Sequence, residues 1–249
     1  MEEKKIITSA SNQHIKDLVA LKNVKERNRV GKVLIEGAHL VDEAYKDGIL
    51  DEVLLVNKNI FYKGVKNTYV TGEIIKKIST TNTPQLILGV ALIKQKKIEF
   101  GKTILILDGV SDPGNLGTII RTAKAFEVAS IILSNDCVDI YNEKVIRATQ
   151  GAVFKMPIVK ANLIEVIPFL KEQGYKVYAT CLKDAIDIEE VKEVSQYALV
   201  LGNEANGVSK EVIALCDKAL KIKMNQEVES LNVAIAGAIC LYSLNQKRK

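Results

Sequence analysis

The chain has 249 residues, 47% of them hydrophobic and 26% charged, a composition that excludes a disordered or fibrous protein. No apolar run approaches the roughly 18 residues of a membrane span, and no apolar segment follows the charged start as in a signal peptide, so we expect a cytoplasmic protein without membrane partners. The net charge of +5 lies within residues 1–100, which hold 17 Lys and Arg against 12 Asp and Glu. This bias favours a polyanionic partner for the first part of the chain, with a solvated lysine-rich surface as the alternative.

The first 95 residues alternate short strands and helices, which predicts a small α/β domain. Apolar spacing predicts helices over 15–25, 38–46 and 72–78, and strands over 33–35, 51–56, 68–70 and 86–93. Basic residues gather around the end of the first helix, and they are the candidate RNA-binding residues: Lys22, Lys25, Arg27, Arg29 and Lys32. The polar stretch 94–97 predicts a linker between domains spanning 1–95 and 100–249.

The second part of the chain has strands that are apolar throughout. They are expected over 103–107, 130–133, 176–180 and 198–201, with helices over 116–126, 143–148, 163–173, 209–215 and 230–245. Such strands predict a parallel sheet covered by helices on both faces. Because ligands of open parallel sheets bind beyond the carboxyl ends of the strands, the loops at those ends are the candidate site.

The first loop, residues 108–117, is a tight turn in which Asn115 is placed to cap the following helix. Arg121 lies just under two turns further on, so its side chain can reach back towards this loop. The third loop, residues 221–229, leads into residues 230–233, with Ser230 as the expected cap of the last helix. Asn232 is expected as an inward polar residue of that helix, where asparagine is unfavourable unless its amide is used.

The second loop, residues 201–209, spaces Gly202 and Gly207 somewhat as a P-loop does, but Val208 stands where a phosphate-binding lysine is required. Nucleoside-triphosphate hydrolysis is therefore not predicted. Glu204 in this loop can accept hydrogen bonds from backbone N–H groups or face a cationic ligand. Two histidines and four cysteines show no metal-ligand spacing, so no metal is expected and the thiols are predicted to be reduced.

Together the three loops resemble the three motifs of the SpoU (TrmH-type) branch of the SPOUT RNA methyltransferases. The resemblance lies in residues 115–117 with 121–123, in 199–209 and in 229–233, with a further family-like stretch over 147–152. The first 95 residues resemble the family's substrate-binding domain, which is related to the ribosomal L30e fold, over 25–29 and at Glu36-Gly37.

The resemblance implies an α/β fold whose catalytic domain contains a deep trefoil knot, a homodimer formed through that domain, and S-adenosylmethionine as cofactor. Carried over by position, the catalytic residues are Asn115, Arg121, Glu204, Ser230 and Asn232. The cofactor-binding residues are Thr180, Gly202, Ile222, Met224 and Leu231. Lys223 and Gln226 depart from the family, which has Pro and Gly at these positions.

The implied reaction is methylation of a ribose 2′-hydroxyl, which must be deprotonated and aligned. Arg121 is the family's activating residue, but a guanidinium that stays charged is a poor base and is better suited to stabilising the alkoxide or orienting a phosphate. We expect 23S ribosomal RNA as substrate, with an antibiotic-resistance role left open. The alternatives are a tRNA 2′-O-methyltransferase, a non-catalytic RNA-binding protein with this fold, and a small-molecule enzyme on a flavodoxin-like sheet. Tyr62 and Tyr69 are candidates for base stacking, with core packing as the alternative.

Overall fold

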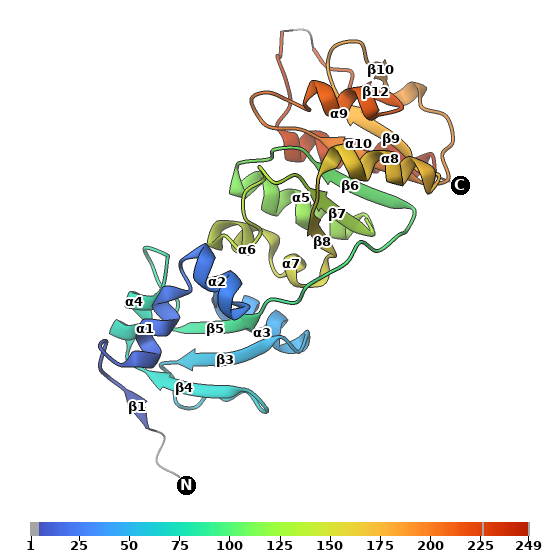
Figure 1. Cartoon of the computed structure of the whole chain (residues 1–249). Coiled ribbons are helices and arrows are strands. Elements are labelled where there is room, and N and C mark those ends of the chain that lie inside the picture. Colours follow the sequence, from blue (N-terminus) through green and yellow to red (C-terminus); the bar gives the residue numbers. More distant parts are fainter. Residues whose placement is uncertain (1–4, 226, 249) are drawn as a thin grey trace. The chain divides into compact units, whose positions relative to one another are not determined.

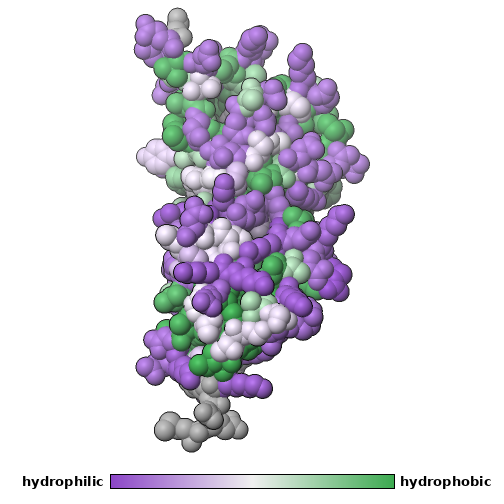
Figure 2. Space-filling model, turned by 90° about the vertical axis from the view of Figure 1, so that its left-hand side faces the viewer, coloured by the Kyte–Doolittle hydropathy of each residue, from purple (hydrophilic) through white to green (hydrophobic). Residues whose placement is uncertain are grey.

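Short apolar strands separated by helices form two sheets, one in each of two units of the chain, Met1–Gln95 and Lys96–Lys249 (Figure 1). The computed structural model describes residues 5–225 and 227–248. None of the helices within these ranges is long and apolar enough to cross a membrane. On the face shown in Figure 2, hydrophobic residues lie in small groups among hydrophilic ones.

The first unit is a five-stranded mixed sheet in the order β1-β4-β3-β5-β2, in which β5 runs antiparallel to β2 and β3. Helices α1 and α4 share a core with alternate residues of β3, β4 and β5, and α3 packs on β2, β3 and β5. The elements are β1 (Ile6–Ile7), α1 (Gln13–Ala20), α2 (Val24–Val30), β2 (Lys32–Glu36), α3 (Ala38–Lys46), β3 (Leu50–Leu55), β4 (Lys66–Val70), α4 (Gly72–Ile78) and β5 (Ile87–Leu92).

The helix predicted over 15–25 is wrong in its extent, because the chain breaks there into α1 and α2. Asn23 is the cause: its side chain accepts a hydrogen bond from the Lys25 backbone N–H and so caps a new helix. Most of the predicted basic cluster therefore lies on α2.

The second unit is a seven-stranded sheet in the order β10-β12-β9-β11-β6-β7-β8, and every strand pair in it is parallel. The elements are β6 (Thr103–Leu107), α5 (Pro113–Ala125), β7 (Ser130–Leu133), α6 (Glu143–Thr149), α7 (Ala152–Lys155), β8 (Ile158–Lys160), α8 (Leu163–Glu172), β9 (Lys176–Thr180), β10 (Ile186–Asp187), the 3₁₀ turn η1 (Ile188–Glu190), β11 (Tyr197–Leu201), α9 (Lys210–Leu215), β12 (Lys218–Lys221) and α10 (Val233–Gln246). The predicted parallel sheet with helices on both faces is confirmed.

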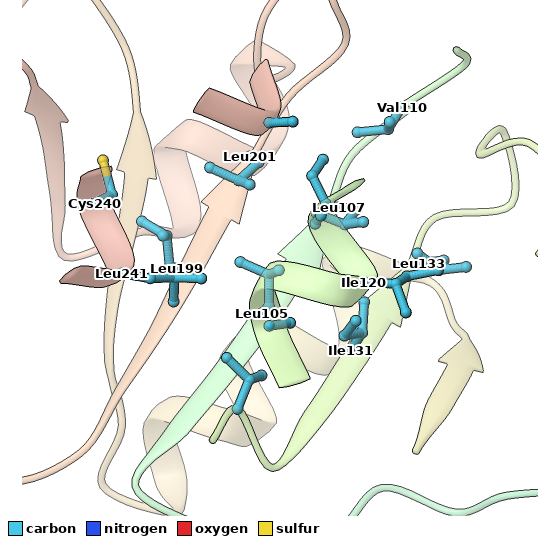
Figure 3. Close-up of a cluster of buried hydrophobic side chains, with 14 of the residues drawn as sticks. Leu105, Leu107, Val110, Ile120, Ile131, Leu133, Leu199, Leu201, Cys240 and Leu241 are labelled. Carbon is cyan, nitrogen blue, oxygen red and sulfur yellow. The ribbon is translucent and has the colours of Figure 1, made fainter. Parts of the chain in front are cut away.

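Alternate residues of the central strands point into two separate cores, because side chains alternate between the faces of a sheet. Leu105 and Leu107 of β6 pack with α5 and α10 on one face (Figure 3). Ile104 and Ile106 of the same strand pack with α8 and α9 on the other. Burial on both faces explains why these strands are apolar at every position.

Two glycines allow close contacts that position α5 and α10. A Cβ added to Gly117 of α5 would lie 2.3 Å from the Cβ of Ala148 in α6, and one added to Gly237 of α10 would lie 2.6 Å from Leu201 Cδ1 in β11. Gly117 belongs to the first motif and Ala148 to the stretch 147–152. Part of the family-like sequence therefore serves helix packing.

Candidate active site

The three loops lie at one edge of the sheet in the second unit. The first loop follows β6, the second follows β11 and the third follows β12. Strands β6 and β11 are neighbours, with Leu107 opposite Leu201, so the first and second loops start side by side. Only β9 separates β11 from β12.

Glu204 of the second loop is the centre of a hydrogen-bond network with the first loop. Its carboxylate accepts hydrogen bonds from the backbone N–H of Ser111 at 3.2 Å, the Ser111 hydroxyl at 3.0 Å and the backbone N–H of Asp112 at 3.1 Å. The Asn115 side-chain amide donates a further bond of 3.0 Å. The single carboxylate of Glu204 thus holds the turn that begins α5.

This network keeps Glu204 ionised. Partial burial raises the pKa of its carboxyl group, but the hydrogen bonds from Asn115, Ser111 and Asp112 outweigh burial and lower the pKa to about 2. A carboxylate with so low a pKa is too weak a base to take a proton from a ribose hydroxyl near neutral pH. Glu204 is therefore placed to position its neighbours.

Asn232 extends the network into the third loop. Its Nδ2 donates to Asn115 Oδ1 at 2.8 Å, while its Oδ1 accepts from the backbone N–H groups of Ala234 and Ile235 at 2.9 and 3.3 Å. Each amide thus has a fixed orientation, because one end is required as donor and the other as acceptor. The three predicted residues Glu204, Asn115 and Asn232 form one continuous chain across the three loops.

The expected caps of the two helices are wrong. Asp112, followed by Pro113 at the first helical position, caps α5 by accepting from the Asn115 N–H at 2.7 Å. Asn232, and not Ser230, caps α10. Because capping falls to Asp112, the Asn115 side chain is available to bridge Glu204 and Asn232.

Three further residues of this edge were missed by the sequence reasoning. Asp108, at the end of β6, accepts hydrogen bonds from the backbone N–H and the hydroxyl of Ser209 at 2.8 and 2.7 Å. The Asn203 side chain donates to the Gly109 carbonyl at 2.7 Å. A carboxylate directly after a buried strand was the available signal for Asp108, but its partner lies 101 residues away.

Two predicted catalytic residues stay outside the network. Arg121 is exposed on α5, and its guanidinium makes no hydrogen bond or ion pair with any residue that the structure describes. Ser230 is likewise exposed and has no hydrogen-bond partner in residues 5–225 and 227–248. Arg121 therefore presents a permanent positive charge to solvent on α5.

The predicted cofactor residues lie beyond β9, β11 and β12. Thr180 ends β9, and Gly202 and Ile222 directly follow the two flanking strands. Ile222, Met224 and Leu231 are half-buried apolar side chains, a character that suits an adenine ring. The second loop has no lysine for a phosphate, so the residues present fit the phosphate-free S-adenosylmethionine.

Gly202 is needed for closure of the second loop. A Cβ at this position would lie 2.1 Å from the carbonyl carbon of Gly207 and from the nitrogen of Val208. Asn203 and Gly207 exchange two backbone hydrogen bonds of 2.9 Å, which close the loop over Gly202. The departure at Gln226 lies outside the described residues, and Lys223 is exposed.

The five candidate RNA-binding residues differ in their surroundings. Arg27 is only 7% exposed and donates to the carbonyl oxygens of Leu21 and Lys22. It therefore caps the end of α1, and its prediction as an RNA contact is corrected. The Lys22 ammonium donates to the Ser79 carbonyl at 2.9 Å.

The other three basic residues are open to solvent to different degrees. Arg29 pairs with Glu26, and Lys32 pairs with Asp51 at 2.8 Å. Lys25 is exposed, and its ammonium has no partner among the residues that the structure describes. No group of His, Cys, Asp or Glu side chains in the described ranges could hold a metal ion.

Comparison with known proteins agrees with this arrangement. Residues 102–242 match the model of the SpoU rRNA Methylase family, and residues 12–89 match an MRM3-like substrate binding domain. The chain is 37% identical over 245 residues to the Bacillus subtilis 23S rRNA (guanosine(2553)-2′-O)-methyltransferase RlmP. The match covers 96% of this chain and 99% of the relative.

Two solved structures share the whole architecture. An rRNA methyltransferase from Sinorhizobium meliloti with AdoMet bound has a TM-score of 0.87, 31% identity and 97% coverage of both chains. An RNA 2′-O ribose methyltransferase has a TM-score of 0.83 and 26% identity, and the match covers 98% of this chain and 99% of that one.

Fold and site thus define an RNA methyltransferase that takes its methyl group from S-adenosylmethionine and transfers it to a ribose 2′-hydroxyl. The chain belongs to the SpoU rRNA methylase family, with an MRM3-like substrate-binding domain before the catalytic one.

Proposed function

We propose that this enzyme methylates a ribose 2′-hydroxyl of 23S rRNA in the cytoplasm, and that the transfer takes place at the edge formed by the three loops. The main support for this site is the hydrogen-bonded series Glu204–Asn115–Asn232, which links the loops through hydrogen bonds of 3.0 and 2.8 Å. The near full-length similarity to RlmP supports 23S rRNA as the substrate.

The catalytic roles follow from the contacts of each side chain. Glu204 is a positioning residue, since its oxygens are occupied by donors from the first loop. Asn115 and Asn232 hold that loop against the start of α10 and align the ribose. Arg121 has no internal partner, and as a permanent cation it stabilises the developing alkoxide or binds the adjacent phosphate. Ser230 is exposed beside Asn232 and contacts the target ribose or its phosphate.

S-adenosylmethionine, when bound, would supply a methyl group on a sulfonium, and the neutral thioether formed when the S–CH₃ bond breaks is an excellent leaving group. Thr180, Gly202, Ile222, Met224 and Leu231 hold it, through loop backbone and apolar side chains. The Thr180 hydroxyl donates to the Val200 carbonyl at 3.2 Å, which fixes the end of β9 against β11.

We assign residues 1–95 to RNA substrate binding and residues 100–249 to catalysis. Lys25, Arg29 and Lys32 on and beside α2 contact RNA phosphates, with Lys22 next to them. Exposed lysine and arginine side chains provide the salt-dependent part of such binding. Arg27 supports the same segment from the interior.

The catalytic unit is further proposed to contain a trefoil knot and to form a homodimer. Helix α10 is apolar on nearly every face: Cys240, Leu241 and Leu244 are buried, yet Ile235 and Tyr242 are 54% and 57% exposed. Covering these two side chains with a second copy would remove apolar surface from water.

The test is transfer of labelled methyl from S-adenosylmethionine to unmodified 23S rRNA and to tRNA in separate reactions, followed by alkaline hydrolysis. Label in an alkali-resistant dinucleotide from 23S rRNA alone is the expected result. Label in tRNA alone would support the tRNA alternative. Absence of transfer to either RNA, together with absence of cofactor binding, would favour the non-catalytic RNA-binding protein.

A further inference from the structure

The connection between β3 and β4 is unusual because it joins two neighbouring parallel strands without a helix. Residues 56–65, which we name the crossover segment, run from the end of β3 to the start of β4. The segment contains Lys58 and Lys63 and has no acidic residue. Its aromatic residues are Phe61 and Tyr62.

The backbone of the crossover segment is held on both sides of Phe61. The Tyr69 hydroxyl donates to the Ile60 carbonyl at 3.2 Å, and the Asn67 side chain bonds the Tyr62 N–H and carbonyl at 2.9 and 2.8 Å. Tyr69 is buried, which agrees with core packing and not with base stacking. These contacts leave little freedom at the segment's centre.

Helix α3 also holds the segment. The Tyr62 hydroxyl donates to Asp42 at 2.6 Å, the Tyr45 hydroxyl donates to the Lys63 carbonyl at 3.0 Å, and the two tyrosine rings meet edge to face at 5.2 Å. Burial, and then the Asp42 carboxylate, raise the pKa of Tyr62, so its hydroxyl keeps its proton and this bond persists over the working pH range.

The Phe61 side chain, in contrast, is mostly open to solvent. It is 62% exposed, more than any other large hydrophobic side chain within the described ranges, and it makes no ring contact there. Lys63 is exposed, and its ammonium has no partner among the described residues. The nearby acidic side chains are engaged, since Asp42 accepts from Tyr62 and Glu43 pairs with Lys46 at 2.9 Å.

We propose that the crossover segment binds an unpaired nucleotide of the RNA substrate, with the base stacked on Phe61 and the flanking phosphates against Lys58 and Lys63. An exposed aromatic ring between cations is the combination used by single-strand RNA-binding surfaces. A backbone already ordered before binding loses little entropy when the base arrives. The positive charge of the segment selects a nucleic acid over an apolar protein surface or a second copy of this equally basic segment.

This inference rests on the proposed function in so far as the bound nucleotide belongs to the enzyme's RNA substrate. The experiment measures methyl transfer to unmodified 23S rRNA by the full chain and by Phe61→Ala, Phe61→Trp and Phe61→Leu. Phe169→Ala, which removes a partly exposed ring of α8 that lies 6.1 Å from the Phe100 ring, is the control for loss of an aromatic side chain elsewhere. Thermal unfolding of each variant verifies that the fold is intact.

We expect Phe61→Ala and Phe61→Leu to raise the KM for RNA about tenfold, with kcat and the KM for S-adenosylmethionine unchanged, because stacking on one aromatic ring is worth about that much. Phe61→Trp and Phe169→Ala should behave as the wild type. Lys63→Gln should reduce the slope of log affinity against log salt by about 1. The proposal would be overturned if wild type and Phe61→Ala had equal KM values for RNA. It would also be overturned if Phe61→Ala and Phe61→Trp raised the KM for RNA equally.

Binding of a twelve-nucleotide polyadenylate separates this inference from the proposed function. If the wild type modifies no 23S rRNA, the proposed substrate is wrong. Phe61-dependent binding of the oligonucleotide would still support the stacking site, and Phe61-independent binding would refute it.

Discussion

Replacing Glu204 by glutamine tests whether one ionised carboxylate holds the catalytic loops together. The substitution keeps the shape but removes the charge, and it turns one acceptor oxygen into an NH₂ group facing the donors of Ser111, Asp112 and Asn115. Hydrogen bonds to a charged group contribute about 1.5–3 kcal/mol each. Because Glu204 is exposed to solvent, screening reduces the total to about 1–2 kcal/mol.

The pH dependence follows from the lowered pKa. Since the pKa in the folded protein is about 2, against an ordinary value of 4.5, ionised Glu204 stabilises the fold fully above pH 4.5. That contribution disappears as the pH falls towards 2. The wild type should therefore exceed Glu204→Gln in stability by about 1–2 kcal/mol at pH 7, or about 3–6 °C in Tm. The difference should shrink below pH 4.5.

The assay is thermal unfolding of both proteins from pH 7 to pH 2.5, together with methyl-transfer kinetics at pH 7. Loosening of the first loop should lower kcat about 10- to 100-fold, because the loop positions Asn115. Glu211→Gln, in α9, removes an exposed carboxylate that has no partner among the described residues. This control should change neither the Tm nor the kcat. Identical stability of wild type and Glu204→Gln at pH 7, with unchanged kcat, would refute the positioning role.

Two further substitutions and one labelling experiment test the packing and capping of α5 and α10. Asn232→Ala should destabilise the fold by about 1 kcal/mol through loss of the α10 cap and should lower kcat more than Ser230→Ala does; equal kcat values in these two variants would contradict the link between Asn232 and Asn115. Gly117→Ala should destabilise by about 1–3 kcal/mol in chemical denaturation, since its Cβ would meet Ala148 at 2.3 Å; an unchanged denaturation midpoint would argue against this packing. Cys240 should resist a thiol reagent at pH 8 in the folded protein, because burial raises its thiol pKa to about 12, and rapid labelling before unfolding would count against it.

Much of the second unit was predictable because its strands are buried on both faces and therefore apolar at every position. The bounds predicted for the strands over 103–107, 130–133 and 176–180 agree with β6, β7 and β9. Strand β12 was missed because lysines stand at both of its ends and only Leu220 is buried. Such a strand has neither an apolar run nor a clear alternation, and its neighbours β9 and β10 determine its pairing.

The limits of prediction are clearest in the basic segment of the first unit. Arg27 and Lys25 carry the same charge and lie two residues apart, yet one is buried and the other exposed. The difference comes from Asn23, which starts α2 and turns Arg27 back towards the carbonyl oxygens that end α1. Composition measures how much positive charge a segment has, whereas the local helix break determines which cations face solvent.

The candidate site shows the same limit over longer distances. The polar residues of the three loops could be selected from the sequence because they follow buried strands. Their pairing could not be selected, because Asn115 meets a residue 89 positions away in Glu204 and one 117 positions away in Asn232. Whether Asn115 caps α5 or bridges two loops depends on Pro113, which fixes the start of α5 and gives the cap to Asp112. Once that cap is assigned, the Asn115 amide must find partners elsewhere, and the carboxylate and amide brought to the same sheet edge by β11 and α10 provide them.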